Sequence, residues 1–168
     1  MEKKFILTDK FVINSFGIKL FQIKCTKSFK YAQKGDFGGY VEKEGNLDQE
    51  NDAWVFGNAR VFGNARVSSN ARVSGDAWVS GNAWVSGDAD IENDNEHCGF
   101  DGFGSCNRHT HAYMTKEKKV EIICGCFRGS IEEFEKKVEE THSGTVYEKQ
   151  YKSIINVIKI KFGLTDFT

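Results

Sequence analysis

The middle of the chain repeats a hydrophobic pattern with a period of six residues. From Val55 it reads VFGNAR, VFGNAR, VSSNAR, VSGDAW, VSGNAW and VSGDAD, and Ile91 follows the last unit. Every unit has Val at its first position, Asn or Asp at its fourth and Ala at its fifth, and five of the six have Gly at the third. This period fits neither an amphipathic helix, which repeats about every 3.6 residues, nor a long alternating strand. It predicts a solenoid in which each unit supplies one short strand and one corner.

The positions within a unit predict which side chains face the interior. In each Ala-x-Val triplet, alternation along the strand turns Ala and Val inward and the residue between them outward. The Gly-Asn or Gly-Asp pair suits a corner, because Gly adopts positive φ and Asx side chains bond nearby backbone groups. We therefore expect Val67 and Val73 to be fully buried, and the Arg and Trp side chains of the repeat to point outward.

The repeat resembles the hexapeptide-repeat family, whose fold is the left-handed parallel β-helix. The family pattern of an aliphatic residue with a small residue four positions later is met by Val55/Ala59, Val61/Ala65, Val67/Ala71, Val73/Ala77, Val79/Ala83 and Val85/Ala89. The resemblance implies triangular coils of three units, or about 18 residues each. Imperfect units at Val41 and Leu47 then begin a further coil.

The segments on either side of the repeat have ordinary strand and helix patterns. Phe5–Asn14 and Ile18–Cys25 predict strands that cap the solenoid, whose unpaired end must be covered. Asn95–Asn107 is polar and glycine-rich, which predicts a connection. Thr110–Met114 and Val120–Cys126 predict a hairpin, with Cys124 and Cys126 on the same strand face.

Two capping boxes predict two helices at the end of the chain. Ser130 with Glu133 begins one that ends near Gly144, and Thr145 with Glu148 begins another that ends at Gly163. We therefore expect a mainly β fold: a short left-handed parallel β-helix over residues 41–94 with an N-terminal β cap over 1–40. A C-terminal α+β module, a β-hairpin plus two helices, follows over 95–168.

Composition excludes several classes of protein. The chain has 168 residues, an apolar fraction of 39% and a net charge of -1, so neither disorder nor bulk electrostatic binding of nucleic acid is expected. No apolar run approaches the roughly 18 residues of a membrane span, and the first ten residues do not form a signal peptide. Five cysteines without such a peptide indicate free thiols and a cytoplasmic protein.

Motifs outside the repeat are similar to those of a group of phage and prophage proteins that carry hexapeptide repeats. The shared motifs are Gly35-Asp36-Phe37-Gly38-Gly39-Tyr40, Cys124-Gly125-Cys126-Phe127-Arg128-Gly129, Glu133-Phe134, Val138 and Thr141-His142. The resemblance implies a phage-encoded accessory protein in the host cytoplasm but brings no established activity. That group has Arg where this chain has Cys106, so any role of that arginine does not carry over.

The hexapeptide resemblance also implies acyl transfer from acetyl-coenzyme A, for which a catalytic His is needed in or beside the coils. The chain has no His before His97, so an acyltransferase is the alternative and not the leading reading. Cysteines and histidines gather between His97 and Cys126, and Cys106 and His109 have a usable ligand spacing. No Cys-x2-Cys pair accompanies them, so buried thiols are expected, and structural zinc or a Cys126–His142 nucleophilic pair are alternatives.

The outward residues of the coils predict an interaction surface. A coil of about 18 residues places Arg and Trp side chains one strand spacing apart, within range of cation–π contact. They are Trp54, Arg60, Arg66, Arg72, Trp78 and Trp84. One interpretation is that these ladders only stabilise the surface of the coil itself. The other is that they form an interface, either between copies in a homo-oligomer, with a trimer favoured, or with another partner. Stacking on nucleotide bases is a further alternative.

Polar residues of the C-terminal module predict a pocket for a small anionic ligand. The candidates are Asn107, Arg108, Thr110, Arg128 and His142. Arg128 precedes a predicted helix N-terminus, where backbone NH groups hold anions. The alternative is that Arg128 is solvated and that His142 only favours a helix C-terminus. We therefore expect a non-enzymatic, phage-type accessory protein without a cofactor or metal, which binds a host protein or a small anionic or nucleotide-like ligand. On the phage resemblance, the setting is antagonism of host defence.

Overall fold

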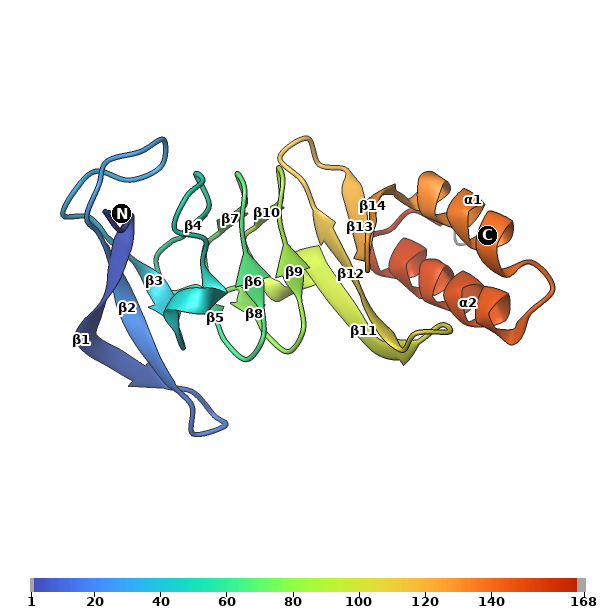
Figure 1. Ribbon diagram of the computed structural model, residues 1–168, viewed down its shortest axis with the longest axis horizontal. Coiled ribbons are helices and arrows are strands. Elements are labelled where there is room, and N and C mark those ends of the chain that lie inside the picture. The colour runs from blue at the N-terminus through green and yellow to red at the C-terminus, as the bar shows by residue number, and fades with distance from the viewer. Residues whose placement is uncertain (1, 166–168) are drawn as a thin grey trace. The chain divides into compact units, whose positions relative to one another are not determined.

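The computed structural model describes residues 2–165 (Figure 1) and divides the chain into two compact units, residues 1–94 and 95–168. The first unit contains the cap and the repeat, and the second contains a β-sheet and two α-helices. Neither helix of the described residues has the length and apolarity that a membrane span requires.

Short parallel strands recur every six residues through the repeat, as predicted. They are β4 (Trp54–Val55), β5 (Arg60–Val61), β6 (Arg66–Val67), β7 (Arg72–Val73), β8 (Trp78–Val79), β9 (Trp84–Val85) and β10 (Asp90–Ile91). Each pairs with a strand three units away, for example Val61 with Val79 and Val67 with Val85. The repeated Val and Ala side chains are buried, Val67 at 1% exposure and Val73 at 0%. Three units therefore complete one coil around a narrow apolar interior.

The first coil begins at the two imperfect units and is longer than the others. Strand β3 (Phe37–Val41) places Val41 beside Val61, and Leu47 forms a bridge with Val67. Both pairs span 20 residues, because the short helix η1 (Glu44–Asn46) and the turn after Leu47 add to the spacing before Ala53. The prediction that a further coil starts at Val41 and Leu47 is confirmed.

The cap continues one side of the solenoid. Strands β1 (Phe5–Ile13) and β2 (Lys19–Cys25) form a hairpin, and the sheet order is β1-β2-β3-β5-β8. The expected boundary at residue 40 falls inside β3. Gly38 and Gly39 allow this join, because a Cβ there would lie 2.6 Å and 2.7 Å from the carbonyl oxygens of Val55 and Ala59.

The cap also buries Trp54 and Phe62, two aromatic residues on the outer side of the coils. Trp54 is 1% exposed, with its ring 6.3 Å from that of Phe5 and 5.3 Å from that of Phe29. Phe62 packs with Leu20, and the partly buried Trp78 lies against the same cluster. Trp54 was predicted to point outward and to be exposed. The prediction of exposure is wrong, because residues far away in sequence cover its ring.

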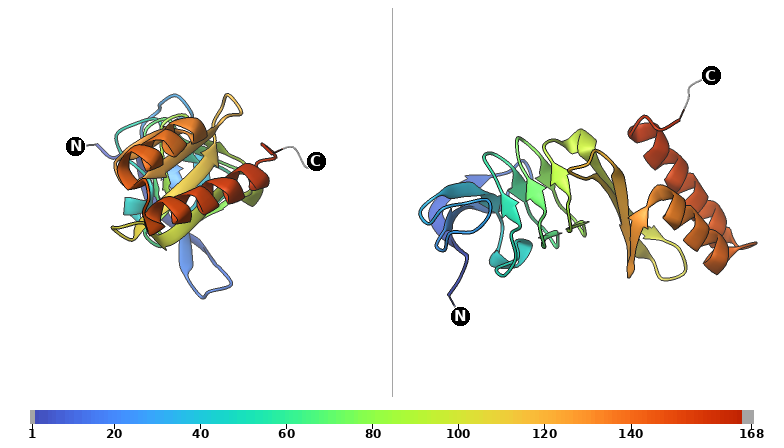
Figure 2. Two further views of the ribbon diagram at one scale, coloured as in Figure 1. Left: turned by 90° about the vertical axis from the view of Figure 1, so that its right-hand side faces the viewer. Right: turned by 90° about the horizontal axis from the view of Figure 1, so that it is seen from above.

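The second unit is a four-stranded antiparallel sheet with two helices on one of its faces (Figure 2). Its elements are β11 (His97–Phe103), β12 (Arg108–Met114), β13 (Val120–Cys124), β14 (Phe127–Ser130), α1 (Ile131–His142) and α2 (Val146–Lys161). The two central strands are the predicted hairpin. The connection expected over residues 95–107 instead contains edge strand β11, which pairing with β12 stabilises despite its glycines.

The chain turns sharply between β13 and β14. Gly125 has φ +61° and ends β13, so Cys126 lies in the turn and not on the strand face that carries Cys124. The prediction that these two thiols share a strand face is wrong. The Ser130–Glu133 capping box is confirmed. At the second helix, Thr145 caps as predicted, but Glu148 accepts its bond from the backbone of Gly144 at 2.7 Å.

Candidate ligand pocket in the C-terminal module

A cavity of about 240 Å³ lies in the second unit, between the helix-bearing face of the sheet and the helices. Its walls come from the β11–β12 loop, the adjoining ends of β12, β13 and β14, one side of α1, and α2. No acidic side chain is among the described residues that line it. Positively charged side chains of the lining are therefore not neutralised by an acidic side chain of the same lining.

Three basic side chains line the cavity: Arg108 at the start of β12, and Lys137 and His142 on α1. The pKa of Arg108 is raised, first by the charge of Cys106 and then by a hydrogen bond to Cys126. Lys137 has an exposed ion pair with Glu140 at 3.6 Å, which is long and screened by water. The raised pKa keeps Arg108 positively charged at the cavity.

Aromatic side chains form the apolar floor. The Phe134 ring lies 5.0 Å from Phe127 and 5.6 Å from Tyr151, and His142 stacks on Tyr151 at 5.5 Å with an interplanar angle of 28°. Burial raises the pKa of Tyr151, so its phenol is neutral. A Cβ at Gly104 would overlap the Tyr151 hydroxyl, so this glycine allows the ring to reach the loop. These rings pack on one another, with Phe134 3% and Tyr151 5% exposed, and they make this side of the cavity apolar.

The structure brings together two of the five predicted ligand residues. Arg108 and His142 line the cavity. Thr110 is buried and donates its hydroxyl proton to the sulfur of Cys124 at 3.3 Å, so it supports the wall from behind. Asn107 lies in the β11–β12 loop with φ +48° and is not among the lining residues.

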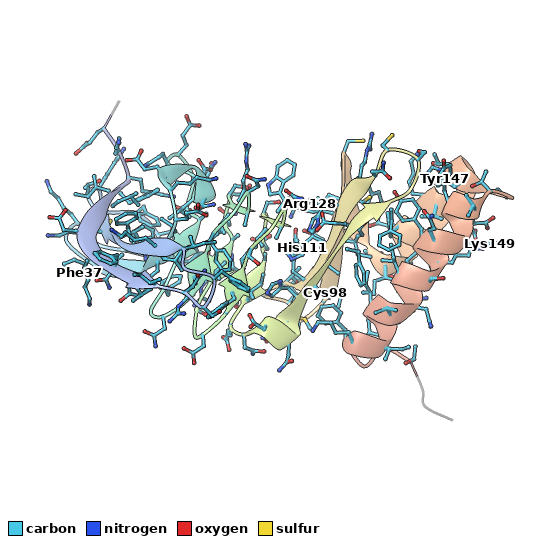
Figure 3. The ribbon with its side chains drawn as sticks, turned by 90° about the horizontal axis from the view of Figure 1, so that it is seen from below. Phe37, Cys98, His111, Arg128, Tyr147 and Lys149 are labelled. Atoms are coloured by element: carbon cyan, nitrogen blue, oxygen red, sulfur yellow. The ribbon has the colours of Figure 1, made fainter. Side chains whose placement is uncertain are left out.

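Arg128 lies outside the cavity. Its Nε donates to Glu121 at 2.7 Å, and Figure 3 shows Arg128 and His111 on the sheet face turned away from the helices. The Ser130–Glu133 capping box engages the backbone NH groups of Ser130 and Glu133 at the start of α1. Alternation along the strand sends the Arg128 guanidinium to the face opposite the helices, so it is not among the described residues that line the cavity.

Three further residues line the cavity that were not predicted from the sequence as ligand residues: Lys137, Thr141 and Tyr151. Lys137 and Thr141 are four residues apart on α1, a spacing that places two side chains on one helix side. Phe134 and Val138 form the buried side of the same helix. The spacing of Lys137 and Thr141 next to them was the sequence signal for a second, polar side. Nothing in the sequence indicated that Tyr151 would meet the β11–β12 loop.

The predicted interface residues of the first unit divide unequally among the three sides of the coil. The Arg60 guanidinium lies 4.9 Å from the centre of the Trp78 ring, whereas Arg72 forms an ion pair with Asp90 at 3.5 Å. On the remaining side, Arg66 is exposed and Trp84 is 47% exposed. A groove of about 280 Å³ runs along that side, lined by Asn64, Arg66, Asn82, Ala83 and Trp84.

One protein family matches part of the chain. The model of the YdcK beta solenoid repeat matches residues 53–69, 65–81 and 71–87, which all lie in the coils. The middle of the chain is a β-solenoid repeat. A comparison with curated proteins finds no match. The solenoid match does not extend to the cavity, so the chemistry of that site depends on its own residues.

Proposed function

We propose that this protein is a non-enzymatic binding protein that holds a small, nucleotide-like anion in the cavity of its C-terminal module. The observation that carries the proposal is the lining: Arg108, Lys137 and His142 surround an aromatic floor, without an acidic residue among the described lining residues. Guanidinium and ammonium groups bind phosphate and carboxylate through charge-assisted hydrogen bonds. The aromatic floor supplies an apolar surface for a ring attached to that anion.

The size of the cavity limits the ligand. At about 240 Å³ it is smaller than the roughly 300–1,000 Å³ pockets that enclose drug-sized molecules. A mononucleotide is close to the largest ligand for such a space, whereas coenzyme A is too large for it. This favours binding over acyl transfer, as does the first unit, whose sequence contains no His.

The biological setting follows from the resemblance to phage proteins. We propose that the protein acts in the host cytoplasm and antagonises host defence by sequestering a small anionic molecule. We also propose that the solenoid is a left-handed coil of hexapeptide repeats and that copies associate, as a trimer, through the side that carries Arg66 and Trp84. The cap covers aromatic residues on the other two sides, which supports this choice of side.

Calorimetry with adenosine monophosphate and adenosine tests the ligand proposal. We expect the nucleotide to bind and adenosine to bind at least about tenfold more weakly, because charged hydrogen bonds carry the difference. Arg108→Gln should weaken nucleotide binding by about tenfold or more, and Arg128→Gln, a matched arginine on the other sheet face, should not. Equal binding of both compounds, no binding of the nucleotide, or turnover of acetyl-coenzyme A would contradict the proposal.

A further inference from the structure

Three of the five cysteines line the cavity, and they differ in access. Cys106 in the β11–β12 loop and Cys126 in the β13–β14 turn are exposed, whereas Cys124 is buried. The Cys124 sulfur accepts from the Thr110 hydroxyl and lies 3.7 Å from that of Tyr151. Cys124 is therefore part of the wall, and only two thiols can meet a molecule that enters the cavity.

Cys126 is the exposed thiol that directly follows Gly125, the residue against which Arg108 packs. The Arg108 side chain lies against the Gly125 backbone, and Arg108 and Cys126 both line the cavity. By contrast, Cys106 has a long contact of 3.8 Å with the Ser105 hydroxyl. Arg108 thus places a positive charge beside the turn that carries Cys126, and this charge also interacts with that of Cys106.

Such surroundings favour reaction at sulfur. The thiolate is the nucleophile in thiol–disulfide exchange, and a neighbouring guanidinium and solvent access both promote its attack. Elsewhere in this unit, burial raises the pKa of Cys98 to about 11, so that thiol stays protonated near neutral pH. Arg108 and Lys137 would also raise the local concentration of an anionic reagent over that of a neutral one.

We propose that Cys126 is a thiol-exchange site for small anionic disulfides, and that the cavity selects them by charge. This inference rests on the proposed function, since it uses the same cations. The Cys126 thiol loses its proton to solvent, and the thiolate attacks one sulfur of the disulfide. A new bond joins that sulfur to Cys126, the original S–S bond breaks, and its electron pair leaves on the other sulfur as a thiolate. Cys126 is oxidised, and half of the small disulfide is reduced.

Two aromatic disulfides of different charge test the inference. Dithiobis(nitrobenzoate) carries two carboxylates, and dithiodipyridine is neutral at pH 7.5. The rate of thiolate release is followed by absorbance for each reagent, and peptide mass spectrometry identifies the modified cysteine. We expect Cys126 to react first with the anionic reagent, and Arg108→Gln to lower the ratio of the anionic to the neutral rate by about tenfold or more.

Matched variants make the result decisive. Cys126→Ser should remove the fast phase, and Cys106→Ser should leave a fast phase that still modifies Cys126. Lys136→Gln, beside the cavity-lining Lys137 but outside the lining, should keep the charge preference, and Lys137→Gln should reduce it. Modification of Cys106 first, or a rate ratio that Arg108→Gln leaves unchanged, would overturn the inference.

A second measurement separates this inference from the proposed function. In calorimetry the parent protein should bind adenosine monophosphate, and the nucleotide should slow modification of Cys126. Nucleotide binding without charge-selective exchange would refute the thiol site alone. Failure of the parent protein to bind the nucleotide would refute the proposed function.

Discussion

The side chain of Arg108 lies across the backbone of Gly125, where a Cβ would overlap its Nη1 and lie 2.8 Å from its Cδ. Arg108 begins β12 and Gly125 follows the end of β13, so both residues lie at the open end of the β12–β13 hairpin. The glycine both turns the chain, with φ +61°, and leaves the space that the guanidinium occupies. The position of the Arg108 guanidinium, the main cation of the cavity, therefore depends on residue 125 having no side chain.

Gly125→Ala should displace Arg108 and weaken nucleotide binding by about tenfold or more, the scale of losing a charged hydrogen bond. It should also lower the unfolding free energy by about 1 kcal/mol, because residue 125 has positive φ. Gly102→Ala is the control: Gly102 has φ +80° with nothing within 4 Å of a Cβ, so it should lose stability and keep binding. Calorimetry and urea unfolding distinguish the two effects, and equal binding losses would contradict the role of Gly125.

Val73→Asp should abolish cooperative folding of the solenoid. Val73 is 0% exposed inside a narrow coil, where an unpaired carboxylate can be neither hydrated nor paired. Asn64→Asp places the same charge at an exposed corner where other units carry Asp, and it should unfold normally. Circular dichroism during heating makes the comparison, and a normal transition for Val73→Asp would show that the register is wrong.

Ser69→Gly should raise the unfolding free energy by about 0.5–1 kcal/mol. Ser69 has φ 59° at a corner where the other five units carry Gly, and the left-handed region is costly for a residue with a Cβ. Ser74→Gly, one position earlier in its unit and without positive φ, should lower the unfolding free energy. Urea titrations of both variants measure the effect, and stabilisation by Ser74→Gly instead would contradict the explanation.

Lys4 should make stability depend on pH in a defined window. Its Nζ donates to the carbonyl oxygens of Asn51 at 2.5 Å and Ala53 at 2.9 Å, and burial lowers its pKa to about 8 from 10.5. Between these two values the unfolded chain binds more protons, so the unfolding free energy should rise as pH increases from about 8 to 10.5. In Lys4→Met, the unfolding free energy measured in urea should not show this rise between pH 8 and pH 10.5. An identical slope in both proteins would exclude Lys4 as its source.

Trp84→Ser should shift self-associated protein toward monomer and leave its β-type circular dichroism unchanged. Trp84 is 47% exposed on the side of the coil that the cap leaves open, and Trp is frequent at the centre of interfaces. Phe37→Ser, which removes a 59% exposed aromatic ring from the cap, is the control and should keep the assembly. Sedimentation at tens of micromolar decides, and a monomeric parent protein would end the proposal of a trimer.

The sequence determined the solenoid and its register. Val, Ala and Gly recur at fixed positions, so the strand, the inward face and the corner of each unit follow from local geometry. The same local logic located both helices and the cap at Ser130. These features need only neighbouring residues, whereas the pairing of Val61 with Val79 was expected from the three-unit coil that the family resemblance implies.

The tertiary structure alone decided the cavity and the exposed side of the coil. Arg108, Lys137 and Tyr151 come from a strand and two helices, and only the packing of helices on the sheet brings them together. Arg128 carries the same charge, but alternation along β14 directs it to the opposite face. Trp54 likewise follows the outward pattern of the repeat, yet distant aromatic residues of the cap bury it. Local spacing fixes where a side chain points, and the folded chain decides what it meets there.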